Sequence, residues 1–91
     1  MLLEFNRHAL FRLEQRCKEF NIPFDIGKEL AIATVRRGML SRKHRSRRNA
    51  TYCCYFDNAL NLTFYVLCSK RVHENQALTV IKTVIIEEGR D

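Results

Sequence analysis

NLTFYVLCS at residues 61–69 and LTVIKTVII at residues 78–86 are the two stretches that decide the fold. In both of them, β-branched, aromatic and aliphatic side chains follow the two-residue period of a β-strand. The polar stretch from Lys70 to Gln76 is expected to join them. The sequence therefore predicts two neighbouring antiparallel strands near the C-terminus.

A third strand is expected immediately upstream. ATYCCYF at residues 50–56 is rich in β-forming residues, and Asp57 and Asn58 are typical of the turn that would follow it. This segment and residues 61–69 then form a hairpin. The C-terminal half of the chain thus supplies three antiparallel strands.

The N-terminal half has the periodicity of helices instead. Asn6 is a suitable N-cap, and apolar residues then recur at spacings of three and four up to Phe20. The stripe that they form consists of Ala9, Leu10, Leu13, Cys17 and Phe20. A helix with one face against the core is therefore predicted, and LLEF at residues 2–5 can form a short strand before it.

A second helix is expected after the turn near Pro23. It would run from Asp25 to Arg37, with Gly38 ending it in a left-handed conformation. Its apolar residues fall on two faces, one with Ile26, Leu30 and Ala33 and the other with Ile32, Val35 and Met39. We therefore expect this helix to be covered on more than one side or to contact a partner.

The length of the chain, 91 residues, is enough for one domain with one core. Helices followed by a run of strands are typical of an α+β fold. We therefore predict a single domain over residues 1–91. It consists of two N-terminal helices, which a short strand can precede, packed on an antiparallel sheet of three to four strands.

Positive charge is concentrated in one segment. The chain carries a net charge of +6, and RRGMLSRKHRSRRN at residues 36–49 contains seven of its 16 Lys and Arg residues and no acidic residue. Such a segment attracts phosphate, so a nucleic acid is the expected partner, with RNA favoured over DNA. We predict that residues 39–49 form a mobile loop. The expected phosphate contacts are Arg36, Arg37, Arg42, Lys43, His44, Arg45, Arg47 and Arg48.

The composition also argues against several classes of protein. No apolar run is long enough to cross a membrane, and charge comes too early at the N-terminus for a secretory signal, so a cytoplasmic protein is expected. The four cysteines include no C-x-x-C pair and are expected to be small buried side chains. The histidines and carboxylates lack ligand-like spacing, and no glycine-rich phosphate loop is present. We expect no metal and no other cofactor.

The first predicted helix gathers polar side chains on one ridge. At about 100° per residue, four of them fall opposite the apolar stripe, and Arg16 lies beside them. These four are His8, Arg12, Gln15 and Glu19. A solvated helix face explains the pattern. So does a site in which one imidazole and two guanidinium groups contact a single phosphodiester.

FNRHALFRLEQR at residues 5–16 resembles the His-Ala-x-x-Arg-x-x-x-Arg opening of a family of small bacterial domains of unknown function. In that family a short strand precedes this helix, a second helix follows, and the chain ends in a β-meander with a Val/Ile-Thr-Val run. The family is similar in size and layout to RelE and BrnT type toxins, which are metal-independent ribonucleases usually neutralised by an antitoxin. The resemblance therefore implies ribonuclease activity and a protein partner.

A ribonuclease that uses no metal needs a base, an acid and a cation that stabilises the phosphorane. His8 is the best candidate for the acid or the base, because an imidazole exchanges a proton near neutral pH. Arg12 and Arg16 are the expected phosphate clamps. Lys82 follows the parity of the apolar residues of its strand, so it projects either into a cleft or toward the edge of the sheet.

Three functions stay open on the sequence alone. The first is a toxin-like, metal-independent endoribonuclease that cleaves RNA by 2′-hydroxyl transesterification. The second is a nucleic-acid-binding protein without catalysis, whose affinity comes from the basic segment. The third is a small inhibitor or adaptor that binds an acidic or nucleic-acid-binding protein. We favour the first, because the helix ridge and the basic segment together offer chemistry and affinity.

Overall fold

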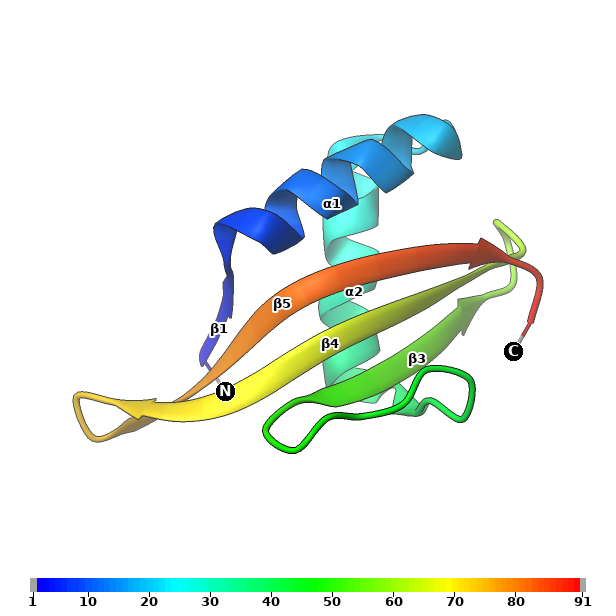
Figure 1. Cartoon of the computed structure of the whole chain (residues 1–91). Coiled ribbons are helices and arrows are strands. Elements are labelled where there is room, and N and C mark those ends of the chain that lie inside the picture. Colours follow the sequence, from blue (N-terminus) through cyan, green and yellow to red (C-terminus); the bar gives the residue numbers. More distant parts are fainter. Residues whose placement is uncertain (1, 91) are drawn as a thin grey trace.

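A computed structural model describes residues 2–90, which form two helices and five strands. The elements are β1 (Leu2–Phe5), α1 (Arg7–Glu19), α2 (Phe24–Arg37), β2 (Met39–Leu40), β3 (Thr51–Asp57), β4 (Leu62–His73) and β5 (Gln76–Glu88). Both helices lie on one face of the sheet, and the segment between β2 and β3 lies on the other (Figure 1). The predicted α+β class is confirmed. Within residues 2–90, no helix combines the length and the apolar character that crossing a membrane requires.

The sheet has the strand order β1-β5-β4-β3-β2 and is mixed. β1 lies parallel to β5, and all other neighbours are antiparallel. The four strands β2 to β5 agree with the predicted antiparallel sheet of three to four strands, whereas the short strand predicted at residues 2–5 adds a fifth, parallel strand that was not expected in the sheet. β2 has two residues, too few for a two-residue period to be visible, and the direction of β1 depends on a partner at the other end of the chain.

The core is built on β4, where residues 62–68 are all buried. On one face of the sheet, Phe64 and Val66 belong to a cluster with Leu13 of α1 and Ala31 of α2. On the opposite face a second cluster forms under the segment between β2 and β3. Its buried members are Ala50, Tyr52, Tyr65 and Leu67. Both faces of β4 are thus covered, one by helices and the other by the basic segment.

β4 and β5 are longer than predicted and are joined by a tight turn. Their pairing extends to His73 opposite Gln76, so the polar stretch between them is mostly strand. Glu74 and Asn75 form the turn, and both have positive φ, at 50° and 64°. Two such residues are typical of the turns that match the twist of a β-hairpin.

A β-bulge interrupts the pairing of β4 with β5. Leu67 pairs with Thr83, whereas Cys68 pairs with Ile81, so Lys82 is an extra residue in β5. Ile81 is fully buried in the core and Lys82 is exposed. The predicted parity of Lys82 with Val84 and Ile86 is therefore wrong. An alternating pattern cannot reveal an inserted residue, because the insertion shifts every position before it to the other face.

α1 begins and packs as predicted. The Asn6 side chain accepts a hydrogen bond from the backbone N–H of Ala9 at 2.7 Å, which is the expected N-cap. Ala9, Leu13 and Cys17 are buried. The apolar stripe therefore fixes the rotation of the helix about its axis.

α2 is rotated relative to the two faces predicted for it. Gly27, Ala31 and Thr34 are the buried residues, while Ile26 is 42% exposed. Gly27 is the point of contact with α1, because a Cβ there would collide with the sulfur of Cys17. Small residues decide the buried face, and a pattern of large apolar residues does not reveal them.

Gly38 ends α2, but not in the predicted left-handed conformation. Its φ of −72° and ψ of 169° are those of extended backbone. A Cβ at this position would press on the carbonyl oxygens of Thr34 and Cys54. Glycine is therefore needed for the close approach of β3, and not for a special backbone angle.

Gly27→Ala is expected to destabilise the fold, although Ala is normally preferred to Gly inside a helix by about 1 kcal/mol. The added methyl group would press on the sulfur of Cys17 where α1 and α2 touch, and overpacking of this kind costs about 1–3 kcal/mol. Urea titration measures the free energy of unfolding. In a Cys17→Ala background the same substitution should be neutral or stabilising. An equal loss in both backgrounds would exclude the sulfur contact as the cause.

Candidate functional site

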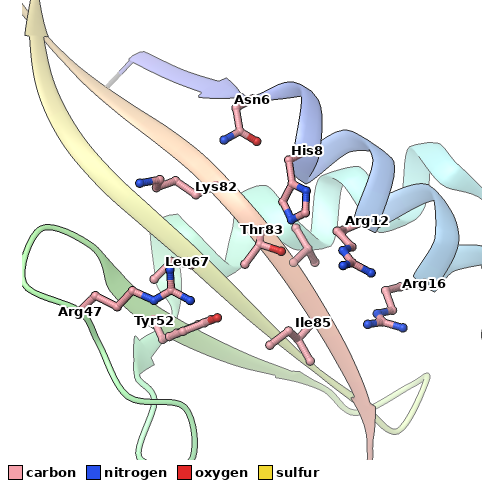
Figure 2. Close-up of a pocket in the computed structure, with 11 residues that line it drawn as sticks. Asn6, His8, Arg12, Arg16, Arg47, Tyr52, Leu67, Lys82, Thr83 and Ile85 are labelled. Atoms are coloured by element: carbon pink, nitrogen blue, oxygen red, sulfur yellow. The ribbon is translucent and has the colours of Figure 1, made fainter.

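A cavity of about 440 Å³ lies between α1 and the basic segment. Figure 2 shows His8, Arg12 and Arg16 projecting in a row from α1, with Arg47 and Tyr52 facing them across β5. We call this cavity the α1 groove. Its lining residues are Asn6, His8, Arg12, Arg16, Arg47, Tyr52, Leu67, Lys82, Thr83, Val84 and Ile85.

The polar ridge of α1 forms one wall of the groove. His8, Arg12 and Arg16 are four residues apart, so they project from the same side of the helix. Arg12 donates a hydrogen bond to the Gln15 side chain at 3.3 Å, and Arg16 donates to the Glu19 carboxylate at 3.0 Å. The three residues that the sequence singled out on this helix thus line the same groove.

The β-bulge supplies a further cation. At a regular position with the parity of Val84, the Lys82 side chain would face the helices and the core. As the extra residue of the bulge it lines the α1 groove instead. All four residues predicted to be catalytic therefore lie around one cavity.

The opposite wall comes from the basic segment. Arg47 and Ala50 exchange backbone hydrogen bonds, at 2.8 Å from Arg47 N–H and 3.3 Å from Ala50 N–H. Because Ala50 is buried in the second cluster, this bridge fixes Arg47 beside the sheet. Among the described residues that line the groove, Arg12, Arg16, Arg47 and Lys82 are cationic and none is a carboxylate. The groove therefore favours an anion.

Glu87 holds the basic segment on the sheet. Its carboxylate accepts a hydrogen bond from the Lys43 ammonium and lies 3.2 Å from His44 Nε2. The hydrogen bond from Lys43 lowers the pKa of Glu87, against the opposite effect of burial, and His44 adds to the lowering. The His44 ring also lies 4.5 Å from the ring of Tyr65 and 5.4 Å from that of Tyr52. These contacts hold residues 43 and 44 in place, and the predicted mobility of the loop stays a prediction.

The other predicted phosphate contacts lie on different surfaces. Arg36 and Arg37 line a cavity at the C-terminal end of α2, and Arg37 and Arg42 line another cavity near the end of β3. Arg45 and Arg48 are exposed. Of the eight predicted contacts, all of which the structure describes, Arg47 alone lines the α1 groove. A cluster of charge in the sequence is therefore divided among several surfaces of the fold.

Two residues of this region were not among the predicted site residues. Tyr52 lines the groove, and Glu87 anchors the segment that carries Arg47. The structure pairs Glu87 with Thr63, which places a carboxylate at the end of the Tyr65 face, whereas the strand predicted at residues 78–86 stops one residue before it. An acidic residue there is a natural partner for a basic loop that crosses the same face.

Glu87→Gln is expected to loosen the basic segment. The folded-state pKa of Glu87 is lowered, so the charged carboxylate stabilises the fold above the usual pKa of 4.5. This stabilisation is lost as the pH falls through the lower folded-state pKa. At pH 7 we expect a loss of about 0.2–1 kcal/mol in the free energy of unfolding, since the pair is largely exposed. In urea titrations the difference from wild type should shrink as the pH falls below 4.5.

Trypsin gives a second measurement of the same change. Cleavage within residues 42–48 at pH 7 should be faster in Glu87→Gln than in wild type. The matched control is Glu88→Gln, which removes the neighbouring, exposed carboxylate. Equal cleavage rates in wild type and both variants would contradict the anchoring role of Glu87.

No protein-family model, curated protein or solved structure matches this chain. The resemblance of residues 5–16 to toxin-like domains therefore stays a prediction. A function has to be argued from the α1 groove and its residues.

Proposed function

We propose that this protein is a metal-independent endoribonuclease that binds an RNA strand in the α1 groove. The observation that supports the proposal is the gathering of one imidazole and four cationic side chains around one cavity, although they come from α1, β5 and the basic segment. Such an arrangement offers proton transfer beside a site for a phosphodiester. It does so without any carboxylate among the described lining residues that could hold a metal ion.

The proposed reaction begins at a ribose 2′-hydroxyl. His8 removes its proton while the oxygen attacks the adjacent phosphorus. Arg12 and Arg16 stabilise the added negative charge of the phosphorane. Lys82 gives a proton to the departing 5′-oxygen, so the products are a 2′,3′-cyclic phosphate and a 5′-hydroxyl. Because the nucleophile is the 2′-hydroxyl, DNA is not a substrate.

Arg47 and Tyr52 are proposed to hold the strand. A volume of about 440 Å³ is within the range of small-ligand pockets, so the groove has room for a single nucleotide. Arg47 approaches from the side opposite α1, where it can contact a second phosphate (Figure 2). Tyr52 lies next to it and can contact the ribose or stack on a base.

RNA binding without cleavage is the second candidate. One observation favours it: His8 is the single imidazole among the described residues of the groove, whereas four side chains there are cations that serve binding as well as catalysis. In that case the groove would still bind RNA, and His8 would add little.

A cytoplasmic location and an inhibitory protein partner complete the proposal. All four cysteines are free thiols, which fits a reducing compartment. Met39 and Leu40 are 73% and 69% exposed on the edge strand β2, and exposed apolar residues on a strand edge are often covered by another protein. An antitoxin-like protein is the partner that the resemblance implies.

His8→Ala is expected to lower the rate of RNA cleavage by about 10²–10⁴-fold, because it removes the proposed base. The measurement is cleavage of a short fluorescent single-stranded RNA in the presence of EDTA. The control is His73→Ala, which removes an imidazole that is 72% exposed at the end of β4. Metal-free cleavage that survived in His8→Ala would contradict the assignment. Binding of the RNA by wild type without any cleavage would favour the second candidate.

Arg47→Gln is expected to weaken binding of the same RNA. The slope of the logarithm of the association constant against the logarithm of the salt concentration should become shallower by about 0.7, the value for one phosphate contact on a single strand. Fluorescence anisotropy at several salt concentrations measures both. Arg45→Gln is the matched control, because Arg45 belongs to the same segment but does not line the groove. If the two variants behaved alike, the whole basic segment and not the groove would supply the affinity.

A further inference from the structure

Cys53 and Cys68 form a pair of thiols on neighbouring strands. Cys53 of β3 pairs with Val66 of β4, two residues before Cys68, so the two cysteines are diagonal neighbours on one face of the sheet. Their side chains share a hydrogen bond. Both line a cavity of about 620 Å³ that also contains Lys70 and shares no lining residue with the α1 groove.

The two thiols differ in chemistry. The hydrogen bond with Cys68 lowers the pKa of Cys53 to about 7, against the effect of burial, and the charge of Lys70 lowers it further. The same hydrogen bond and burial raise the pKa of Cys68. Cys53 is half-buried and Cys68 is 8% exposed, so a small reagent in the cavity reaches Cys53 more easily.

We propose that Cys53 and Cys68 are an oxidation site that peroxide converts reversibly to a disulfide. The Cys53 thiolate attacks one oxygen of hydrogen peroxide, which gives a sulfenic acid and releases hydroxide. The Cys68 sulfur then attacks the Cys53 sulfur. The S–S bond forms, the S–OH bond breaks, and the hydroxyl group leaves as water with the Cys68 proton. Two electrons pass from the thiol pair to peroxide, and a thiol reductant reverses the change.

The surrounding structure favours the second step. Oxidation of Cys53 removes the thiolate that raised the pKa of Cys68, so Cys68 ionises more readily once it is needed as a nucleophile. Diagonal neighbours have Cα atoms about 7–8 Å apart, whereas a disulfide requires at most about 6.8 Å, so the strands must approach slightly. The pairing of β4 with β5 shifts between Leu67 and Cys68, so the ladder on the side of β4 away from Cys53 is irregular at this point. The approach of Cys68 to Cys53 is therefore less constrained by β5 than it would be in a regular ladder.

The test uses reduced, purified wild-type protein and an equimolar amount of hydrogen peroxide. After the remaining thiols are blocked, mass spectrometry should show the loss of two hydrogen atoms, reversed by dithiothreitol. A single tryptic peptide, residues 49–70, contains Cys53, Cys54 and Cys68, so variants locate the bond. Cys54→Ser should form the disulfide as wild type does, because Cys54 packs on the opposite face of the sheet. Cys53→Ser should not form it.

Cys68→Ser should stop at the Cys53 sulfenic acid, which dimedone captures. A disulfide that required Cys54, or peroxide treatment that left all thiols reduced, would overturn the proposal. If a variant fails to fold, a measurement on the wild type alone still tests the proposed oxidation site. Iodoacetamide at pH 7 should modify Cys53 about tenfold faster than Cys54, and equal rates would also overturn it. The site is independent of RNA cleavage, so neither result bears on the function of the α1 groove.

Discussion

The burial of β4 on both faces is the constraint on which the rest of the structure depends. Residues 62–68 are buried without a gap, and the two helices cover only the face that carries Phe64 and Val66. The face of Tyr65 and Leu67 must be covered by another part of the chain. Burying side chains of this size contributes about 1.5–3 kcal/mol each, whereas an exposed ion pair such as Lys43 with Glu87 contributes about 1 kcal/mol or less. Apolar contact therefore decides where the basic segment lies, and the ion pair adjusts it.

Local patterns predicted the parts of the fold that local interactions determine. The stripe of α1, its Asn6 cap and the two long strands follow from residues close together in the sequence. The strand at residues 2–5 could be predicted, but its parallel pairing with β5, the two-residue β2 and the buried face of α2 could not, because each depends on contacts with distant parts of the chain. Lys82 was selected as a site residue from a parity that the bulge invalidates, and it nevertheless lines the groove.

The same distinction applies to the site. His8, Arg12 and Arg16 could be grouped from the sequence, since they share one helix face. Arg47 could not be distinguished from its neighbours in the basic segment. Arg45 and Arg47 are only two residues apart, yet Arg47 lines the groove and Arg45 does not. The tertiary contacts of Ala50 and Glu87, and not the density of charge, decide which arginine enters the groove.

The α1 groove also opposes the stability of the fold. Cations gathered around one cavity repel one another, and two unit charges at 4 Å in water do so by about 1 kcal/mol. The bulge that presents Lys82 also removes a regular position from the ladder. Gln15 and Glu19 hold Arg12 and Arg16 in place, yet the carboxylate of Glu19 does not line the cavity. An acidic residue inside the groove would reduce this repulsion and make the fold more stable. No described lining residue is acidic, as expected of a site in which an anionic ligand supplies the missing negative charge.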